Sequence, residues 1–60
     1  MFIEVLTRKG EIVFLNIEHI LFITEHKNSA VIFDVSGNDY YLDSTYSSIR
    51  DKINDLLKTK

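Results

Sequence analysis

The residues of this chain best suited to chemistry are two histidines, and their spacing separates them. His19 and His26 each directly follow a glutamate, and the chain has no other histidine. A metal ion needs imidazole and carboxylate groups that converge on one point. The residues between them form strands readily, and an extended strand of that length would hold the two rings about 20 Å apart. The spacing therefore indicates two solvent-facing histidines in turns, and no metal site.

Carboxylates and hydroxyls are more numerous, but no spacing gathers them into a catalytic group. Asp51 and Asp55 lie four residues apart, on the polar face of a predicted helix. Catalytic acids and bases have pKa values shifted by burial, which an exposed helix face does not provide. The serines near the helix start have no histidine close in sequence and are typical of a helix cap and first turn: Ser44, Ser47 and Ser48. We expect no enzymatic activity, no cofactor and no small-molecule substrate.

The composition is that of one small domain covering residues 1–60. The formal net charge of -2 argues against a duplex-DNA binder, which relies on a basic surface. There is no cysteine, so neither a disulfide nor a thiolate metal site can stabilise so short a chain. The first residues lack the basic start and apolar run of a signal peptide, and no apolar run reaches the ~20 residues of a membrane span. We expect a cytoplasmic protein.

Alternating apolar residues and turn signals divide the chain into five strands and one helix. Turns are predicted at residues 8–10, 26–29 and 36–39, which are rich in polar and turn-forming residues. Asn16 is placed to cap a single helical turn before the third strand, and Asp43 or Ser44 to cap the C-terminal helix. Short connections favour a meander of adjacent antiparallel strands. The expected class is α+β, with strands at residues 2–7, 11–15, 20–25, 30–35 and 40–42 and a helix at residues 46–57.

The apolar residues of the predicted helix recur at helical spacing, so they form one stripe that faces the core. This core stripe is Ile49, Ile53, Leu56 and Leu57. A helix is about 10 Å wide, whereas five strands make a sheet about 20 Å wide. The helix can therefore cover only part of one sheet face.

The strands nevertheless direct apolar side chains toward both faces. In the second strand Phe14 and Leu15 point to opposite faces, and in the third Phe22 and Ile23 do the same. Near-continuous apolar strands are typical of a sheet buried on both sides. These four residues are candidates for the core or for an interface, and the pattern does not decide between the two. We expect a homo-oligomer or a stable complex with another protein; the alternative is barrel-like curvature that folds the sheet onto itself.

The segments IEVLTR, FLNIEHILFI, AVIFDVSG and YYL follow in order and are closed by the helix. This succession resembles the small flagellar FlbD-type family, which includes the swarming protein SwrD. Asp34 departs from the family pattern, which has an apolar residue there. The resemblance implies a very small, non-enzymatic protein associated with flagellar motor output, and it carries no functional residues onto this chain.

The segments IVFLNIEHILFITEHKNSAVIF and YYLDSTYSSIRDKI also resemble the N-terminal part of the LytTR DNA-binding domain. The later strands and loops of that domain carry much of its DNA contact, and they have no counterpart in this sequence. The second resemblance therefore implies the arrangement of sheet and helix more than it implies DNA binding.

These observations favour a non-catalytic protein–protein interaction module that self-associates, with a flagellar accessory role implied by the first resemblance. The alternative is a small oligomeric transcriptional or phage-type regulator that binds nucleic acid. Its candidate contacts are Arg8, Lys9 and Lys27, the cations of two predicted turns.

Overall fold

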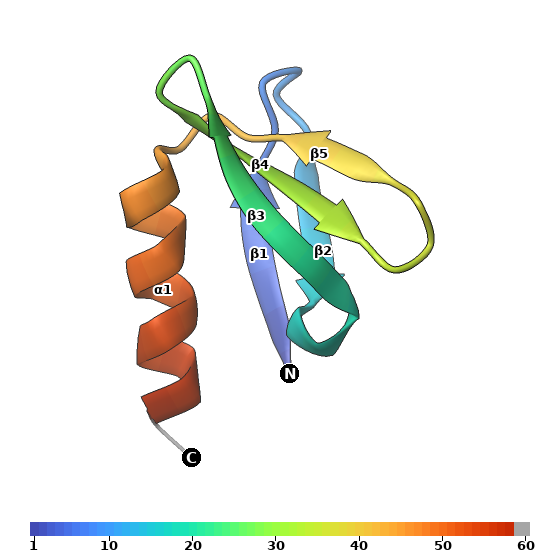
Figure 1. The fold of residues 1–60 in the computed structure, drawn as a ribbon, viewed down its shortest axis with the longest axis vertical. Coiled ribbons are helices and arrows are strands. Elements are labelled where there is room, and N and C mark those ends of the chain that lie inside the picture. The colour runs from blue at the N-terminus through green and yellow to red at the C-terminus, as the bar shows by residue number, and fades with distance from the viewer. Residues whose placement is uncertain (59–60) are drawn as a thin grey trace.

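The computed structural model describes residues 1–58 and shows five antiparallel strands followed by one C-terminal helix (Figure 1). The expected α+β class is thus confirmed, and the element bounds differ from the predicted ones by about one residue. The elements are β1 (Phe2–Leu6), β2 (Ile12–Asn16), the 3-10 turn η1 (Ile17–His19), β3 (Ile20–His26), β4 (Ser29–Asp34), β5 (Asp39–Tyr41) and α1 (Tyr46–Lys58). Within the described residues no helix has the length and apolarity that crossing a membrane requires.

The strands form two sheets that lie against each other. One holds β1 and β2, the other holds β3, β4 and β5, and Figure 1 shows the first behind the second with α1 along one side. The two sheets meet at a corner, where Thr7 forms a β-bridge with Leu42 and the Asp43 N–H donates to the Leu6 carbonyl at 3.0 Å. The meander therefore bends back on itself. This is the curvature weighed above, and it packs the inner faces of the two sheets together while Phe2, Phe14 and Phe22 on the outer faces stay exposed.

The core lies between the two sheets and is closed by α1. Strand alternation explains its membership, because every second residue of β1 turns inward. The buried residues of the cluster are Ile3, Val5, Leu15, Ala30, Ile32, Leu42 and Ile49. Removal of their apolar surface from water is the main favourable contribution to folding.

Three residues of the predicted helix stripe face this core, and the fourth does not. Ile49 is buried, and Ile53 and Leu56 pack against the cluster half-buried. Leu57 is 47% exposed, so its assignment to the core is wrong. The reason is helical geometry: each residue advances by about 100°, which turns Leu57 away from its neighbour Leu56 and to the margin of the stripe.

The turns form where glycine and polar residues predicted them. Gly10 and Gly37 have φ of 85° and 89°, a left-handed conformation that glycine adopts without strain. Lys27 and Asn28 also have positive φ, 51° and 67°, in the two-residue turn between β3 and β4. Positive φ at both positions is typical of the type I′ turn, whose twist suits a hairpin. Asn16 caps η1 as predicted, since its Oδ1 accepts from the Glu18 N–H.

The cap of α1 is Thr45, and the assignment to Asp43 or Ser44 is wrong. Thr45 Oγ1 accepts from the Ser48 N–H at 3.2 Å. The two residues before it are still held by the sheets, because the Ser44 carbonyl accepts from the Ala30 N–H at 2.8 Å and Asp43 is bonded to β1. The chain is therefore released into the helix only at Thr45.

Replacing Thr45 by alanine should lower the free energy of unfolding by about 1 kcal/mol, because one helical N–H loses its acceptor. Ser44→Ala is the matched control, since the bond that Ser44 makes comes from its backbone and survives the change. Urea unfolding followed by circular dichroism measures both. Equal losses in the two variants would place the cap elsewhere.

Candidate interaction surfaces

The outer face of the β1–β2 hairpin is apolar and open to solvent. We call Phe2, Leu6, Ile12 and Phe14 the hairpin face. Phe14 is 70% exposed and Ile12 69%, and the rings of Phe2 and Phe14 stack with centroids 5.7 Å apart. The register explains the grouping, because residues directly opposite across the ladder share a face, and Leu6 is opposite Ile12. Glu4, opposite Phe14, is the one carboxylate that the residues of β1 and β2 place on this face.

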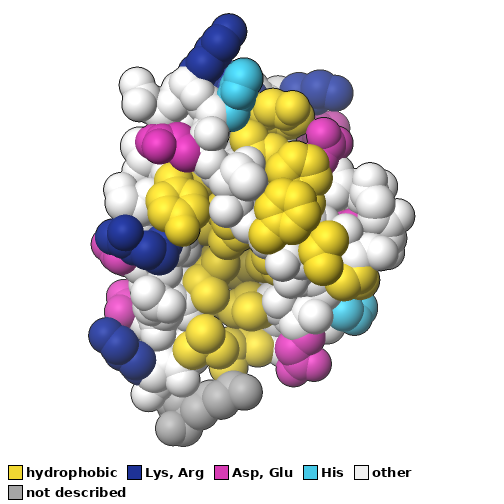
Figure 2. All heavy atoms as spheres, in the orientation of Figure 1, with side chains coloured by type: hydrophobic (Ala, Val, Ile, Leu, Met, Phe, Trp, Pro, Cys, Tyr) yellow, Lys and Arg dark blue, Asp and Glu magenta, His cyan; other side chains and the backbone are white. Residues whose placement is uncertain are grey.

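The outer face of the three-stranded sheet carries a second apolar group, which Figure 2 shows in yellow over β3–β5. We call Phe22, Phe33 and Tyr41 the aromatic face. Phe22 and Phe33 stack with centroids 4.7 Å apart, and His26 meets Tyr41 edge-on at 6.2 Å. Phe22 and Tyr41 are each nearly half exposed. Contiguous exposed apolar side chains of this kind mark surfaces that bind other molecules.

The structure shows which of the four candidate strand residues belong to the core and which lie on the surface. Leu15 is buried in the core and Ile23 packs against it half-buried. Phe14 and Phe22 point outward, one on each of the two faces. Sequence reasoning did not single out Phe2, Ile12 or Tyr41 as surface residues, although the alternation within β1 and β2 held the signal for the first two.

The basic turns lie together, and the cations of the first turn are matched by acids. The β1–β2 and β3–β4 turns, which hold Arg8, Lys9 and Lys27, are at the same end of the molecule (Figure 1). The first turn borders a pocket of about 390 Å³ against β5, lined by Thr7, Arg8, Lys9, Glu11, Asp39, Tyr40 and Tyr41.

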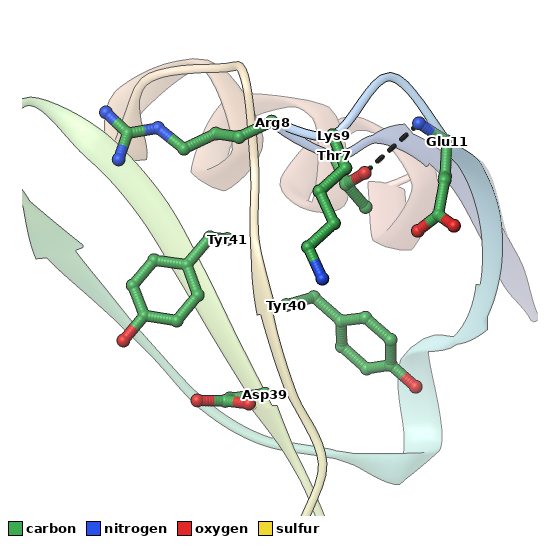
Figure 3. A pocket seen from close by; sticks show the side chains of 7 residues that line it. All are labelled: Thr7, Arg8, Lys9, Glu11, Asp39, Tyr40 and Tyr41. Carbon is green, nitrogen blue, oxygen red and sulfur yellow. Dashed lines mark hydrogen bonds between the residues drawn. The ribbon is translucent and has the colours of Figure 1, made fainter.

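Charges in this pocket balance. Figure 3 shows the Lys9 side chain turned toward the Tyr40 ring, while Arg8 reaches away above Tyr41. Glu11 and Asp39 contribute as many carboxylates as there are cations. Recognition of phosphate needs a surplus of positive charge, and this pocket has none.

Asp34 organises the loop between β4 and β5. Its Oδ1 accepts from the backbone N–H groups of Ser36 and Asn38, both at 2.9 Å, and its Oδ2 lies 3.5 Å from the Tyr40 hydroxyl. The Asn38 backbone bond, followed by the other donors, lowers the pKa of Asp34 below its ordinary value of 3.8, although partial desolvation opposes the shift. A carboxylate at this position thus holds a turn, which an apolar residue could not do.

The pKa of Asp34 gives the loop a pH dependence of known sign. Because the folded pKa is lowered, its contribution to stability is present above pH 3.8 and is lost as the pH falls through the folded pKa. We expect Asp34→Asn to have a lower Tm than the wild type near neutral pH, with the gap closing as the pH drops below 4. Thermal melts over a pH series measure the gap. A constant gap would show that the charge of Asp34 does not matter.

The two histidines stay apart. His19 ends η1 before β3 begins, and His26 is the last residue of β3. Among residues 1–58 no group of three or more metal-binding side chains is arranged to hold an ion. The exposed Arg50–Asp51 pair on α1, at 3.2 Å, is a contact between chain neighbours and adds little stability.

Comparison of the chain with protein-family models, with curated proteins and with solved structures finds no match.

Proposed function

We propose that this chain is a cytoplasmic, non-catalytic protein–protein interaction module that self-associates. The observation that carries the proposal is the exposure of apolar side chains on the outer faces of both sheets. The hairpin face combines a stacked pair of rings with two aliphatic side chains, and the aromatic face consists of rings. Curvature of the meander covers neither.

The energetics favour association. Complete burial of one large apolar side chain is worth about 1.5–3 kcal/mol. Several such side chains on one face therefore match the roughly 5–15 kcal/mol that is the whole stability of an ordinary domain. A chain of 60 residues without cysteine has few other means of stabilisation, and a second copy supplies one.

Size-exclusion chromatography with light scattering, run over micromolar concentrations, tests the proposal. We expect a mass that is a multiple of the 7.0 kDa chain and that falls on dilution. A mass of one chain at every concentration would contradict self-association. The readout does not depend on which surface is used.

The biological process that we propose is flagellar motor output, and its support is the resemblance of the strand and helix segments to FlbD-type proteins. Deletion of the gene from a flagellated host should reduce swarming on soft agar, and the intact gene should restore it. Unchanged motility would contradict the process and leave self-association standing.

A second candidate function is nucleic-acid binding by an oligomer, which the common location of the two basic turns favours. Arg8→Glu combined with Lys9→Glu should then abolish a salt-dependent shift of labelled DNA. The same pair of changes should leave the mass of the assembly unchanged. Absence of any shift by the wild type at low salt would exclude this candidate.

A further inference from the structure

β2 has an open edge whose backbone groups belong to the most exposed apolar residues. In an antiparallel ladder, hydrogen-bonded and non-bonded pairs alternate. The Thr7 N–H donates to the Glu11 carbonyl at 2.8 Å, so the pairs that contain Ile12 and Phe14 are non-bonded ones. Their N–H and C=O groups therefore point away from β1. Within residues 1–58 β2 has no strand on that side.

The outward carbonyls of β1 show the same alternation, but they have partners. The Leu6 carbonyl accepts from the Asp43 N–H at 3.0 Å, and the Glu4 carbonyl accepts from Lys52 Nζ at 2.7 Å. The N-terminal sheet is thus closed on its β1 side and open on its β2 side.

The edges of the other sheet carry the features that discourage strand addition. β5 has only three residues, and its Tyr41 carbonyl accepts from the Arg8 N–H at 2.9 Å. β3 is interrupted by a register shift between Ile20 and Phe22, and it carries the exposed charge of Glu25. Bulges, short length and charge are the common means of protecting an edge. β2, with the sequence IVFLN, has none of them.

We propose that β2 pairs antiparallel with β2 of a second copy, about a two-fold axis at Phe14. The inference rests on the proposed self-association and names the strand edge at which the two copies meet. Outward backbone groups must meet outward groups, and the outward residues of β2 are Ile12, Phe14 and Asn16. An axis at Phe14 is the register that pairs all three within the strand, with Phe14 opposite Phe14 of the second copy and Ile12 opposite Asn16. The product is a four-stranded sheet, β1-β2-β2-β1, in which the Phe2 and Phe14 rings of both copies form one row.

The charges favour this partner and orientation. The Arg8–Lys9 turn precedes β2 and Glu18 follows it, so antiparallel pairing brings the basic end of each copy to the acidic end of the other. Glu11 offsets one of the two cations. Face-to-face packing of two hairpin faces would instead bury Glu4, which has no side-chain partner among residues 1–58, and burial of a lone carboxylate is costly.

Single-cysteine variants test the register, because the native chain has no cysteine. Opposed residues of a hydrogen-bonded pair have Cα atoms about 5.5 Å apart, within the range that a disulfide spans. Phe14→Cys should therefore form a covalent dimer on oxidation. Ile12→Cys is the matched control, with nearly equal exposure, and the pairing separates its two copies by four residues, about 13 Å along the strand.

A charge placed on the edge is the second test. Phe14→Lys should weaken the dimer on the order of tenfold or more in light scattering. Phe22→Lys, on the other sheet, should leave the dimer unchanged. Circular dichroism establishes that each variant is folded.

The outcomes separate this inference from the proposed function. A covalent dimer of Phe14→Cys but not of Ile12→Cys, with a dimer of Phe14→Lys weakened on the order of tenfold or more, supports the β2 edge. If Phe14→Lys assembles as strongly as the wild type, or if Ile12→Cys cross-links as fast as Phe14→Cys, the edge pairing is overturned and self-association stands. A wild type that is monomeric throughout overturns both.

Discussion

Ile32→Ala is expected to unfold a large fraction of the protein under conditions in which the wild type is folded. Ile32 has no exposed surface and lies on β4 between Ile23 and Tyr40, facing β1 and β2 across the core. Truncation of a buried isoleucine costs about 2–5 kcal/mol, since the lost transfer energy adds to the energy of the cavity. A 60-residue domain belongs at the lower end of the usual range of roughly 5–15 kcal/mol. One such cavity therefore removes most of its stability.

Urea unfolding with both variants and the wild type at one protein concentration measures this loss, because association of folded copies makes the apparent stability depend on concentration. Leu21→Ala is the control: Leu21 is 62% exposed and lies outside the core cluster. Its change should stay within about 0.5 kcal/mol. If both variants lose the same stability, the two sheets do not share the core described here.

The parts of the fold that depend on neighbouring residues could be predicted from the sequence. The turn at Gly37 requires only a local left-handed conformation, and Asn16 caps the turn that directly follows it. Strand alternation likewise needs only the period of two. Each of these features depends only on residues that are close in the chain, so the sequence alone is enough to predict it.

The division into two sheets could not be predicted, because it depends on contacts between distant residues. Thr7 and Leu42 are brought together only when the whole meander bends. The same contact explains the misplaced helix cap. Asp43 is suitable as a cap by type, yet its backbone bond to Leu6 keeps it in the strand arrangement.

The sequence identifies the apolar strand residues that can form a surface, but it does not show which of them are exposed. Alternation shows that Phe14 and Leu15 face opposite ways, and it cannot show which way is inward. That choice depends on where the second sheet lies. Once the sheets are placed, Leu15 is buried and Phe14 is 70% exposed, and the same argument separates Ile23 from Phe22.

Ile49→Ala is the second change with a large expected effect, and it acts on the attachment of α1. Ile49 is the buried residue of the helix and belongs to the core cluster, so its truncation should cost about 2–5 kcal/mol. A helix of 13 residues is marginal by itself in water and relies on packing of its apolar face. We therefore expect the helical circular dichroism signal to weaken together with the lost stability.

Leu57→Ala provides the matched control on the same helix, because it removes the same kind of side chain from a position that is 47% exposed. Its loss should be below about 1 kcal/mol, since less apolar surface leaves the interior. The ratio of the two losses measures where the helix meets the sheets. Equal losses would mean that Leu57 is covered in solution. If a second copy supplies that cover, the loss at Leu57 should disappear on dilution, whereas the loss at Ile49 should persist.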